Sequence, residues 1–402
     1  MHGDESTGAE RSPAPLLSHG GAPAPSAPRL DGVPPARRVV LPTGTLEIQE
    51  RGGAVRLDDI CSYAARRNPR RGFLFVSHLL GRYLPVRPAE ARAAHRRLAA
   101  AMPEVEGPVA VLGIAEAGVG LAHGVFDVLA ERRPALEAVF LHSTRHHLPA
   151  PLALDFDEAH SHAPEHRVHL PREPHLQSRL QDARTAVIVD DEITTGRTFR
   201  GLVSRWRARF PKVRRFVHLV LKSWLDAPLP AEIHGARIEV ISLVEGRFRW
   251  TQHSRHELPP GVVGAPARER GAAALPSADW GRFGVGGRRL LPRLLGAPPP
   301  PGTKVLVVGT EELQYPGFLL AERLEARGHD ARFVATTRSP VALGAAIRRL
   351  AHYPDCYGEG RTVYLYNVDP DAFDRIYLLT DAPRDRIPAR LVEDLDAHVL
   401  CV

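Results

Sequence analysis

The chain alternates between continuous apolar runs and segments in which apolar residues recur at helical spacing. The runs that predict buried strands span residues 108–114, 138–142, 185–190, 216–221 and 238–244. The segments that predict helices span residues 88–101, 119–132 and 196–209. Strands that are apolar throughout and separated by helices are typical of parallel sheets covered on both faces. The pattern therefore predicts an α/β domain whose parallel sheet is flanked by helices.

The same alternation returns nearer the C-terminus. Strands are predicted at residues 304–308, 331–335, 362–366 and 375–379, and helices at residues 314–326 and 341–351. We expect a second, smaller, Rossmann-like α/β domain with a parallel sheet of its own.

Two stretches rich in proline, glycine and alanine divide the chain. Residues 1–38 lack the apolar residues that a core requires, and we predict a disordered tail there. Residues 254–302 are predicted to be a linker that docks in part. The expected domains are therefore residues 39–253 and residues 303–402, with few contacts across the boundary.

Composition limits the class of protein. The chain has 402 residues, a formal net charge of +7 and only three cysteines. Arginine supplies nearly all the positive charge, which we interpret as a solvated basic surface rather than a nucleic-acid-binding patch. The cysteines show no metal-binding spacing and suit a reducing compartment. No apolar run is long enough to cross a bilayer, so we expect a cytoplasmic protein without membrane contact.

Residues 187–198 carry the most specific motif. Two carboxylates, Asp190 and Asp191, follow an apolar strand directly and can accept hydrogen bonds from the adjacent hydroxyls of a ribose. The turn that opens the next helix consists of Thr194, Thr195, Gly196, Arg197 and Thr198. Backbone N–H groups at a helix N-terminus favour a phosphate, and the glycine allows close approach. The alternative is an ordinary capped strand-to-helix turn.

This motif closely resembles the signature for phosphoribosyl pyrophosphate (PRPP) in type I phosphoribosyltransferases. The resemblance implies that Asp190 and Asp191 hold the ribose 2′- and 3′-hydroxyls and that residues 194–198 bind the 5′-phosphate. Purine-salvage members carry an acidic residue where this chain has Thr194. The motif is therefore more similar to that of orotate phosphoribosyltransferases.

A second turn of small residues follows the apolar run 108–114. It consists of Ala115, Glu116, Ala117 and Gly118. Such a turn also presents backbone N–H groups to an anion. By the same resemblance it is the loop that binds pyrophosphate. Orotate-type enzymes often have a lysine at the position of Ala117, so the positive charge here must come from another segment or be absent.

The segment after residue 142 offers such charge. It contains Arg145 and a polar stretch, residues 156–166, with His160, His162 and His166. Type I enzymes have a mobile loop at this place that closes over PRPP. The resemblance implies that these side chains contact the pyrophosphate, and a histidine could protonate it as it leaves. An ordinary polar loop is the main alternative, and a metal site is the least favoured one.

In the second domain, polar residues follow the predicted strands. The candidates for a ligand site are Glu311, Glu312, Arg338, Ser339 and Asp381. Open α/β sheets bind ligands at the carboxyl-terminal ends of their strands, so we expect a small molecule other than PRPP here. Polar strand ends without a ligand are the alternative.

Taken in order, these segments resemble the phosphoribosyltransferases of tellurite-resistance operons, whose C-terminal domain is named for the Thr-Arg-Ser-Pro motif found here at residues 337–340. The resemblance covers about residues 41–252 and 278–402. It implies transfer of a 5-phosphoribosyl group from PRPP to an undefined nitrogenous base, in the synthesis of a nucleotide-like metabolite. The expected partners are PRPP with its Mg²⁺, the base, a second copy in a homodimer and operon-encoded enzymes. We expect no metal ion held by the protein itself.

Two further functions stay open at this point. One is a catalytically inactive, PRPP-binding regulator that binds nucleic acid, which the uncharged Ala117 favours. The other is a scaffold whose domains pass a metabolite to operon partners. The acid pair and the histidine-rich stretch favour the enzyme.

Overall fold

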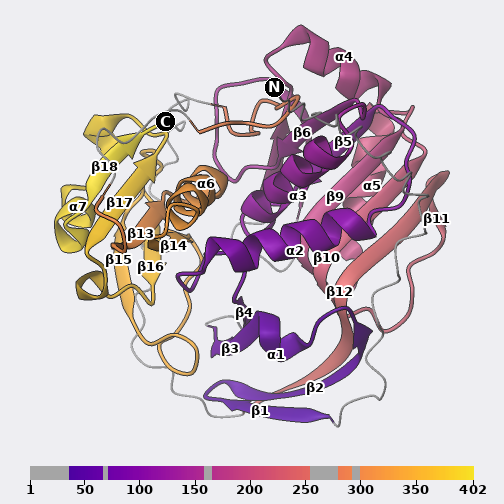
Figure 1. Ribbon diagram of the computed structural model, residues 1–402. Coiled ribbons are helices and arrows are strands. Elements are labelled where there is room, and N and C mark those ends of the chain that lie inside the picture. Colours follow the sequence, from indigo (N-terminus) through magenta and orange to yellow (C-terminus); the bar gives the residue numbers. More distant parts are fainter. Residues whose placement is uncertain (1–35, 67–70, 158–164, 254–278, 292–298) are drawn as a thin grey trace, which may run out of the picture.

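The computed structural model describes residues 36–66, 71–157, 165–253, 279–291 and 299–402 (Figure 1). Its larger sheet has the strand order β1-β2-β12-β10-β9-β5-β6, and β11 (Glu232–Ile233) pairs with β12. The mutually parallel strands are β5 (Val109–Gly113), β6 (Ala138–His142), β9 (Thr185–Ile193), β10 (Arg215–Ser223) and the first part of β12 (Ala236–Gln252). These are the strands that the apolar runs predicted. The parallel α/β prediction is confirmed.

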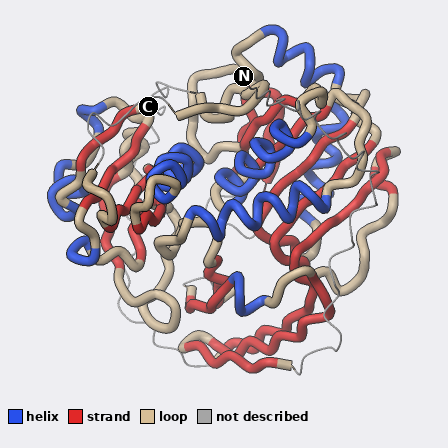
Figure 2. Tube along the Cα trace, viewed as in Figure 1, coloured by secondary structure: helices blue, strands red, loops and turns tan. Residues whose placement is uncertain are grey.

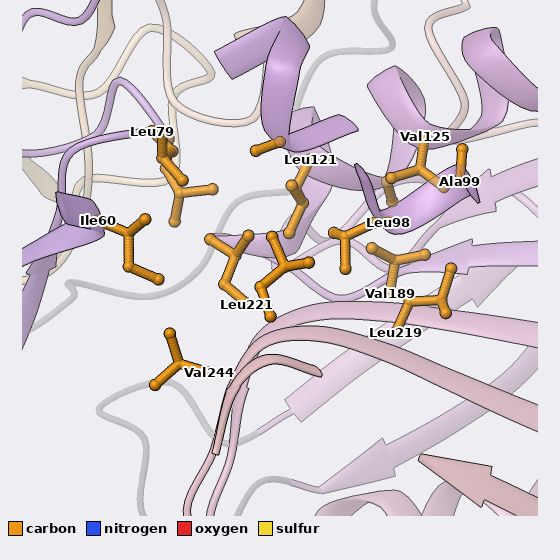
Figure 3. Close-up of a cluster of buried hydrophobic side chains, with 14 of the residues drawn as sticks. Ile60, Leu79, Leu98, Ala99, Leu121, Val125, Val189, Leu219, Leu221 and Val244 are labelled. Carbon is orange, nitrogen blue, oxygen red and sulfur yellow. The ribbon is translucent and has the colours of Figure 1, made fainter. Parts of the chain in front are cut away.

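Helices cover both faces of this sheet (Figures 1 and 2). The helices are α2 (Pro88–Ala101) and α3 (Gly118–Arg132) on one face, and α4 (Pro174–Asp182) and α5 (Arg197–Arg209) on the other. Successive side chains of a strand point to opposite faces. Val189 therefore shares a core cluster with Leu98 of α2 and Val125 of α3, which Figure 3 shows. Its neighbour Ile188 packs in a second cluster with Trp206 of α5.

A smaller layer, which we call the hood, lies beyond the carboxyl-terminal ends of the central strands (bottom of Figure 1). It consists of β1 (Arg37–Leu41), β2 (Gly44–Gly53), α1 (Leu57–Ile60), β3 (Cys61–Ala65) and β4 (Phe73–Ser77). From Val244 to Gln252, β12 pairs antiparallel with β2, and the register of this pairing shifts between Glu245 and Gly246. A bulge of this kind bends a strand. Strand β12 thus connects the main sheet to the hood.

The polar stretch after β6 is more regular than the sequence suggested. It contains an antiparallel hairpin of β7 (Leu152–Asp157) and β8 (Glu165–His169). Leu154, Phe156 and Val168 are buried in the core cluster that includes α5 and anchor the hairpin there. Residues 158–164, with His160 and His162, lie outside the described residues.

The second domain has a four-stranded parallel sheet with the order β14-β13-β17-β18. Its elements are β13 (Lys304–Gly309), α6 (Gln314–Glu325), β14 (Asp330–Ala335), β17 (Arg375–Thr380), α7 (Ala389–Leu395), β18 (His398–Cys401) and two short 3-10 helices, Pro370–Ala372 and Arg384–Arg386. The prediction of a second α/β domain is confirmed.

Two secondary-structure predictions for this domain are wrong. Residues 341–351 do not form a helix: Ala345 has a φ of 51°, and the N–H of Ala342 donates to the carbonyl of Ala65 in the hood at 3.1 Å. Tertiary contacts thus override the helical spacing of the apolar residues. Residues 350–354 instead form β15 (Leu350–Pro354), which pairs antiparallel with β16 (Thr362–Tyr366). The run 362–366 was expected in the parallel sheet and lies outside it.

The two domains share a buried boundary. Arg92 of α2 binds both Asp127 of α3 and Glu322 of α6, at 3.0 Å and 2.6 Å. The ring of His123 in α3 stacks on that of Tyr315 in α6, with 3.9 Å between centroids. The expectation that few contacts cross the boundary is therefore wrong, because α6 packs against α2 and α3.

Part of the predicted linker docks on the first domain. Trp280, Phe283 and Val285 are buried, and Val285 exchanges backbone hydrogen bonds with Phe140 at the edge strand β6. In the part of the chain that the structure describes, no helix is both long and apolar enough to span a bilayer.

Candidate functional site

A cavity of about 720 Å³ lies where the carboxyl-terminal ends of β5 and β9 meet the hood and the second domain. Asp190, Asp191 and the predicted turn 194–198 line this cavity, as do residues 115–117 of the predicted turn 115–118; Gly118 does not. They meet there because β5 and β9 are neighbours in the parallel sheet, so their carboxyl-terminal ends share one edge. The second domain contributes residues 338–340 together with Arg361, Thr362 and Tyr364.

The turn after β9 is shaped for an anion. Gly196 is the N-cap of α5 and has a φ of 68°, in the left-handed region that favours glycine. A Cβ at this position would lie 2.7 Å from Cδ2 of Leu229. Gly196 has no side chain to cap the helix, and the N–H of Arg197 makes only a long hydrogen bond, of 3.4 Å, to Oγ1 of Thr195. The N–H groups of this first turn can therefore turn to a phosphate, and the helix dipole favours its negative charge.

The acid pair is held by a buried cation that the sequence analysis missed. Nζ of Lys222, at the end of β10, lies 3.4 Å from Oδ2 of Asp191. Burial alone would lower the pKa of Lys222, but the carboxylates of Asp191 and Glu192 outweigh burial and raise it. The sequence does place a charged residue, Lys222, directly after the predicted strand 216–221, but not the neighbourhood of β10 and β9 that brings it to Asp191.

A third carboxylate extends the pair. Glu192 accepts hydrogen bonds from Nη2 of Arg71 at 2.5 Å and from Nε1 of Trp224 at 3.3 Å. Burial would raise the pKa of Glu192, but Arg71 and Lys222 outweigh it and lower the pKa. The carboxyl-terminal end of β9 therefore presents three carboxylates, two of which are fixed by ion pairs with Lys222 and Arg71.

The loop after β5 packs directly on the acid-bearing strand. Gly118 begins α3, and a Cβ there would lie 2.7 Å from the carbonyl oxygen of Val189. The N–H of Ala115 donates to Oγ of Ser143 at 2.9 Å, and the Ala115–Glu116 peptide bond is cis. Only glycine at position 118 allows this approach, which brings the two anion-binding turns to one cavity.

Glu116 ties this loop to the second domain. Its Oε2 accepts hydrogen bonds from Nη2 of Arg82 at 2.9 Å and from Oγ1 of Thr337 at 2.7 Å. Nε2 of Gln314 in α6 donates to the Glu116 carbonyl at 2.9 Å. Burial would raise the pKa of Glu116, but Arg82 and Arg338 outweigh it and lower the pKa. Glu116 thus acts as a charged anchor for the loop.

The candidates from the second domain divide into two groups. Arg338 and Ser339 line the same cavity as the PRPP motif. Glu311, Glu312 and Asp381 are almost fully buried and do not line it. Two of the five candidates therefore line this cavity, and three do not. The reason is that the carboxyl-terminal ends of β13 and β17 face the first domain and not solvent.

Of the candidate catalytic residues, the structure brings Arg145 to the cavity. Its Nη2 donates to the carbonyl oxygen of Ala115 at 3.2 Å. His166 lies elsewhere: its ring is fully buried, stacks on Phe156 and hydrogen-bonds Oγ of Ser143 at 3.0 Å. His166 therefore supports the hairpin and the loop after β5 from beneath and does not line the cavity.

Comparisons with known proteins now give the family. Residues 60–247 match a family model described as phosphoribosyl transferase, and residues 288–395 match the TRSP domain that lies C-terminal to it. The chain belongs to this phosphoribosyltransferase family. No curated protein matches the chain.

Solved phosphoribosyltransferases also match. The adenine phosphoribosyltransferase of Rhodothermus marinus is 17% identical over 46% of this chain and 95% of its own, with a TM-score of 0.29. The adenine phosphoribosyltransferase of Trypanosoma brucei, in complex with AMP, pyrophosphate and ribose-5-phosphate, is 14% identical. The match covers 52% of this chain and 86% of that protein, with a TM-score of 0.34. The hypoxanthine phosphoribosyltransferase of Staphylococcus aureus is 16% identical over 41% of this chain and 79% of its own, with a TM-score of 0.24.

An aromatic wall forms the hood side of the phosphoribosyltransferase cavity. It consists of Phe73 and Phe75 of β4 and Phe248 and Trp250 of β12. The rings of Phe73 and Trp250 are 4.9 Å apart, and those of Phe73 and Phe248 are 5.1 Å apart. Nε1 of Trp250 is buried without a hydrogen-bond partner among the described residues. The wall thus offers flat apolar contact and one unused donor.

The carboxylates at the cavity suit Mg²⁺ that arrives with a phosphorylated substrate. Within the described ranges, no group of three or more His, Cys, Asp or Glu side chains is arranged to hold a metal ion. Mg²⁺ prefers oxygen ligands and is usually held by one or two carboxylates together with substrate phosphates. Asp190 and Asp191 supply such carboxylates at the cavity.

Proposed function

We propose that this protein transfers the 5-phosphoribosyl group of PRPP to a nitrogenous base and releases pyrophosphate. The observation that carries the proposal is that one cavity is lined by the acid pair, by the turn 194–198 and by residues 115–117 of the second turn. The last residue of that second turn, Gly118, begins α3. These groups match the three polar parts of PRPP, which are its ribose hydroxyls, its 5′-phosphate and its diphosphate.

Each part of PRPP has a proposed partner. Asp190 and Asp191 accept hydrogen bonds from the 2′- and 3′-hydroxyls, and Lys222 orients Asp191 through their ion pair. The N–H groups and hydroxyls of residues 194–198 hold the 5′-phosphate at the N-terminus of α5. Residues 115–118 receive the diphosphate. The carboxylates of Asp190 and Asp191 would also hold Mg²⁺ that arrives with PRPP, and the ion would supply positive charge to the diphosphate.

The chemistry needs positioning more than a nucleophilic side chain. The bond from C1′ to the diphosphate oxygen breaks, and the base nitrogen forms a bond to C1′ with its lone pair. The ribose passes through an oxocarbenium-like state, which water would capture if it were admitted. Arg145 contributes positive charge near residues 115–118. His160 and His162 remain predicted donors of a proton to the departing pyrophosphate.

The aromatic wall supports a planar heteroaromatic base as the acceptor. Aromatic rings favour stacked or edge-on contacts with another flat ring. Nε1 of Trp250 can donate to a ring nitrogen or carbonyl oxygen of the base and so satisfy its hydrogen bond. We expect the acceptor to be a nucleobase or an analogue with an acceptor atom in that position.

Incubation of the full chain with PRPP, Mg²⁺ and a panel of nucleobases tests the proposal. Pyrophosphate release and the new nucleotide are followed by mass spectrometry. The double variant Asp190→Asn with Asp191→Asn should abolish turnover, whereas Asp182→Asn, whose side chain pairs with Lys212 at the surface, should not. PRPP binding without turnover for any base would favour the alternative, a regulator that binds PRPP, to which the uncharged Ala117 points.

A further inference from the structure

The motif that names the second domain forms part of the wall of the phosphoribosyltransferase cavity. Arg338, Ser339 and Pro340 line the cavity opposite the PRPP motif. Thr337, the first residue of the motif, donates to Glu116 at 2.7 Å, and the N–H of Arg338 lies 3.4 Å from the same oxygen. The motif therefore adjoins residues 115–118, the turn assigned above to the diphosphate.

The backbone of the motif is fixed by its own domain. Thr337 exchanges two backbone hydrogen bonds with Tyr364 of β16, at 2.9 Å and 2.7 Å. The hydroxyl of Tyr366 donates to the carbonyl of Ser339 at 2.8 Å and accepts from the N–H of Val341 at 2.7 Å. A segment held on both sides in this way presents its side chains without reorganisation when a ligand binds.

The guanidinium of Arg338 is oriented but incompletely satisfied. Nε donates to Glu311 at 2.6 Å, and Nη2 contacts His146 at 2.6 Å and Glu359 at 3.3 Å. Nη1 is buried and has no hydrogen-bond partner in the described part of the chain, and the side chain is only 6% exposed. A buried N–H group without a partner is costly, so a ligand with acceptor oxygens at this cavity would be stabilised.

The turn 115–118 needs a cation from outside itself. Ala117 carries no charge, and the acidic Glu116 is already engaged by Arg82 and Thr337. A diphosphate brings several negative charges, and the planar guanidinium of arginine matches phosphate oxygens well. Arg338 enters the cavity from the second domain beside this turn.

We propose that Arg338 binds the diphosphate of PRPP and the released pyrophosphate through Nη1, so that the second domain completes the active site of the first. This inference rests on the proposed function and deepens it. It predicts that ligands with a diphosphate engage both domains, whereas ligands with only the ribose and 5′-phosphate engage the first domain alone.

Hydrogen–deuterium exchange on the wild-type full chain tests this without any variant. Inorganic pyrophosphate with Mg²⁺ should slow exchange in residues 336–339 as well as 115–119, whereas ribose 5-phosphate should slow exchange in residues 194–199 only. Protection of 115–119 by pyrophosphate without protection of 336–339 would overturn the role of Arg338 and leave the proposed function standing. If neither ribose 5-phosphate nor PRPP slows exchange in residues 194–199, the proposed function itself is refuted.

A paired variant gives the second measurement. Arg338→Met with Glu311→Gln removes the cation and its closest carboxylate together, so no unpaired charge is left in that pair. We expect the Kd for pyrophosphate to rise about tenfold or more in calorimetry, because a hydrogen bond to a charged group is lost. The Kd for ribose 5-phosphate should not change. Glu311→Gln alone and Arg390→Met, at an exposed arginine of α7, are the controls.

Comparing the change in Kd for pyrophosphate with the change for ribose 5-phosphate distinguishes a direct contact with the ligand from a structural effect of the substitution. Equal weakening of pyrophosphate and ribose 5-phosphate would mean that Arg338 only supports the fold, and this would overturn the proposal. Unchanged affinity for pyrophosphate in a folded variant would overturn it as well. If the paired variant does not fold, exchange on the wild-type protein decides the question.

Discussion

Glu312 joins the two domains, and we predict that Glu312→Gln destabilises the protein by about 3 kcal/mol. The side chain is 2% exposed and accepts hydrogen bonds from Oγ1 of Thr144 at 2.6 Å, the N–H of Arg145 at 2.7 Å and Nε of Arg282 at 3.2 Å. Removal of one partner of a buried ion pair costs about 3–5 kcal/mol. The lower end applies because Arg282 retains its ion pair with Asp381.

The loss of stability caused by Glu312→Gln should depend on pH. Burial alone would raise the pKa of Glu312, but the ring of His146 and the guanidinium groups of Arg282 and Arg338 hold it well below its ordinary value of 4.5. A carboxylate with a lowered pKa in the folded state stabilises the fold above its unfolded pKa, and this contribution disappears as the pH falls through the folded pKa. The difference in unfolding free energy between wild type and variant should therefore be largest near neutral pH and shrink below about pH 4.5.

Urea unfolding of the full chain at pH 7 and at pH 4, followed by tryptophan fluorescence, measures this difference. Glu393→Gln, at an exposed position of α7, is the control and should change stability by less than about 0.5 kcal/mol. A Glu312→Gln effect as small as that of the control, or a difference that grows at acid pH, would refute the assignment of Glu312 as an ionised bridge between the domains.

Three other variants address the first domain. Asp190→Asn with Asp191→Asn should weaken PRPP binding at least tenfold in calorimetry with an unchanged circular dichroism spectrum, since each charged hydrogen bond is worth about 1.5–3 kcal/mol. Gly196→Val should weaken ribose 5-phosphate binding, because a β-branched residue is strained at a φ of 68°; unchanged affinity would exclude the turn as the phosphate site. His160→Ala with His162→Ala should lower kcat more than PRPP affinity, and equal losses would limit these histidines to binding.

The central sheet and the anion-binding turns could be predicted because their signals are local. An apolar run such as residues 185–190 can only be buried, and glycine at position 196 supplies the positive φ that the turn needs. The helix at residues 88–101 begins at a proline, which favours the first helical turn, and its predicted bounds agree with α2. These features depend on neighbours a few residues away, so sequence patterns reveal them.

The partners of the site side chains could not be predicted in this way. Lys222 meets Asp191 only because β10 lies beside β9, and Thr337 meets Glu116 only because two domains dock. Both pairs depend on packing between segments far apart in the chain. Residues 341–351 failed for the same reason, since hydrogen bonds to the hood replaced those of a helix.

A sequence signal for the docking did exist in the helices. A helix at the surface of a domain needs only one apolar face, and a helix that is apolar all round must be buried on every side. Apart from His123 and Asp127, helix α3 has only apolar residues and glycine from Gly118 to Leu129, and nearly all of these residues are buried. The first domain covers only one side of α3, because the other side carries His123 against Tyr315 of α6. A first domain expressed alone would therefore expose this face to water. The same packing between the domains holds the motif at residues 337–340 at the cavity.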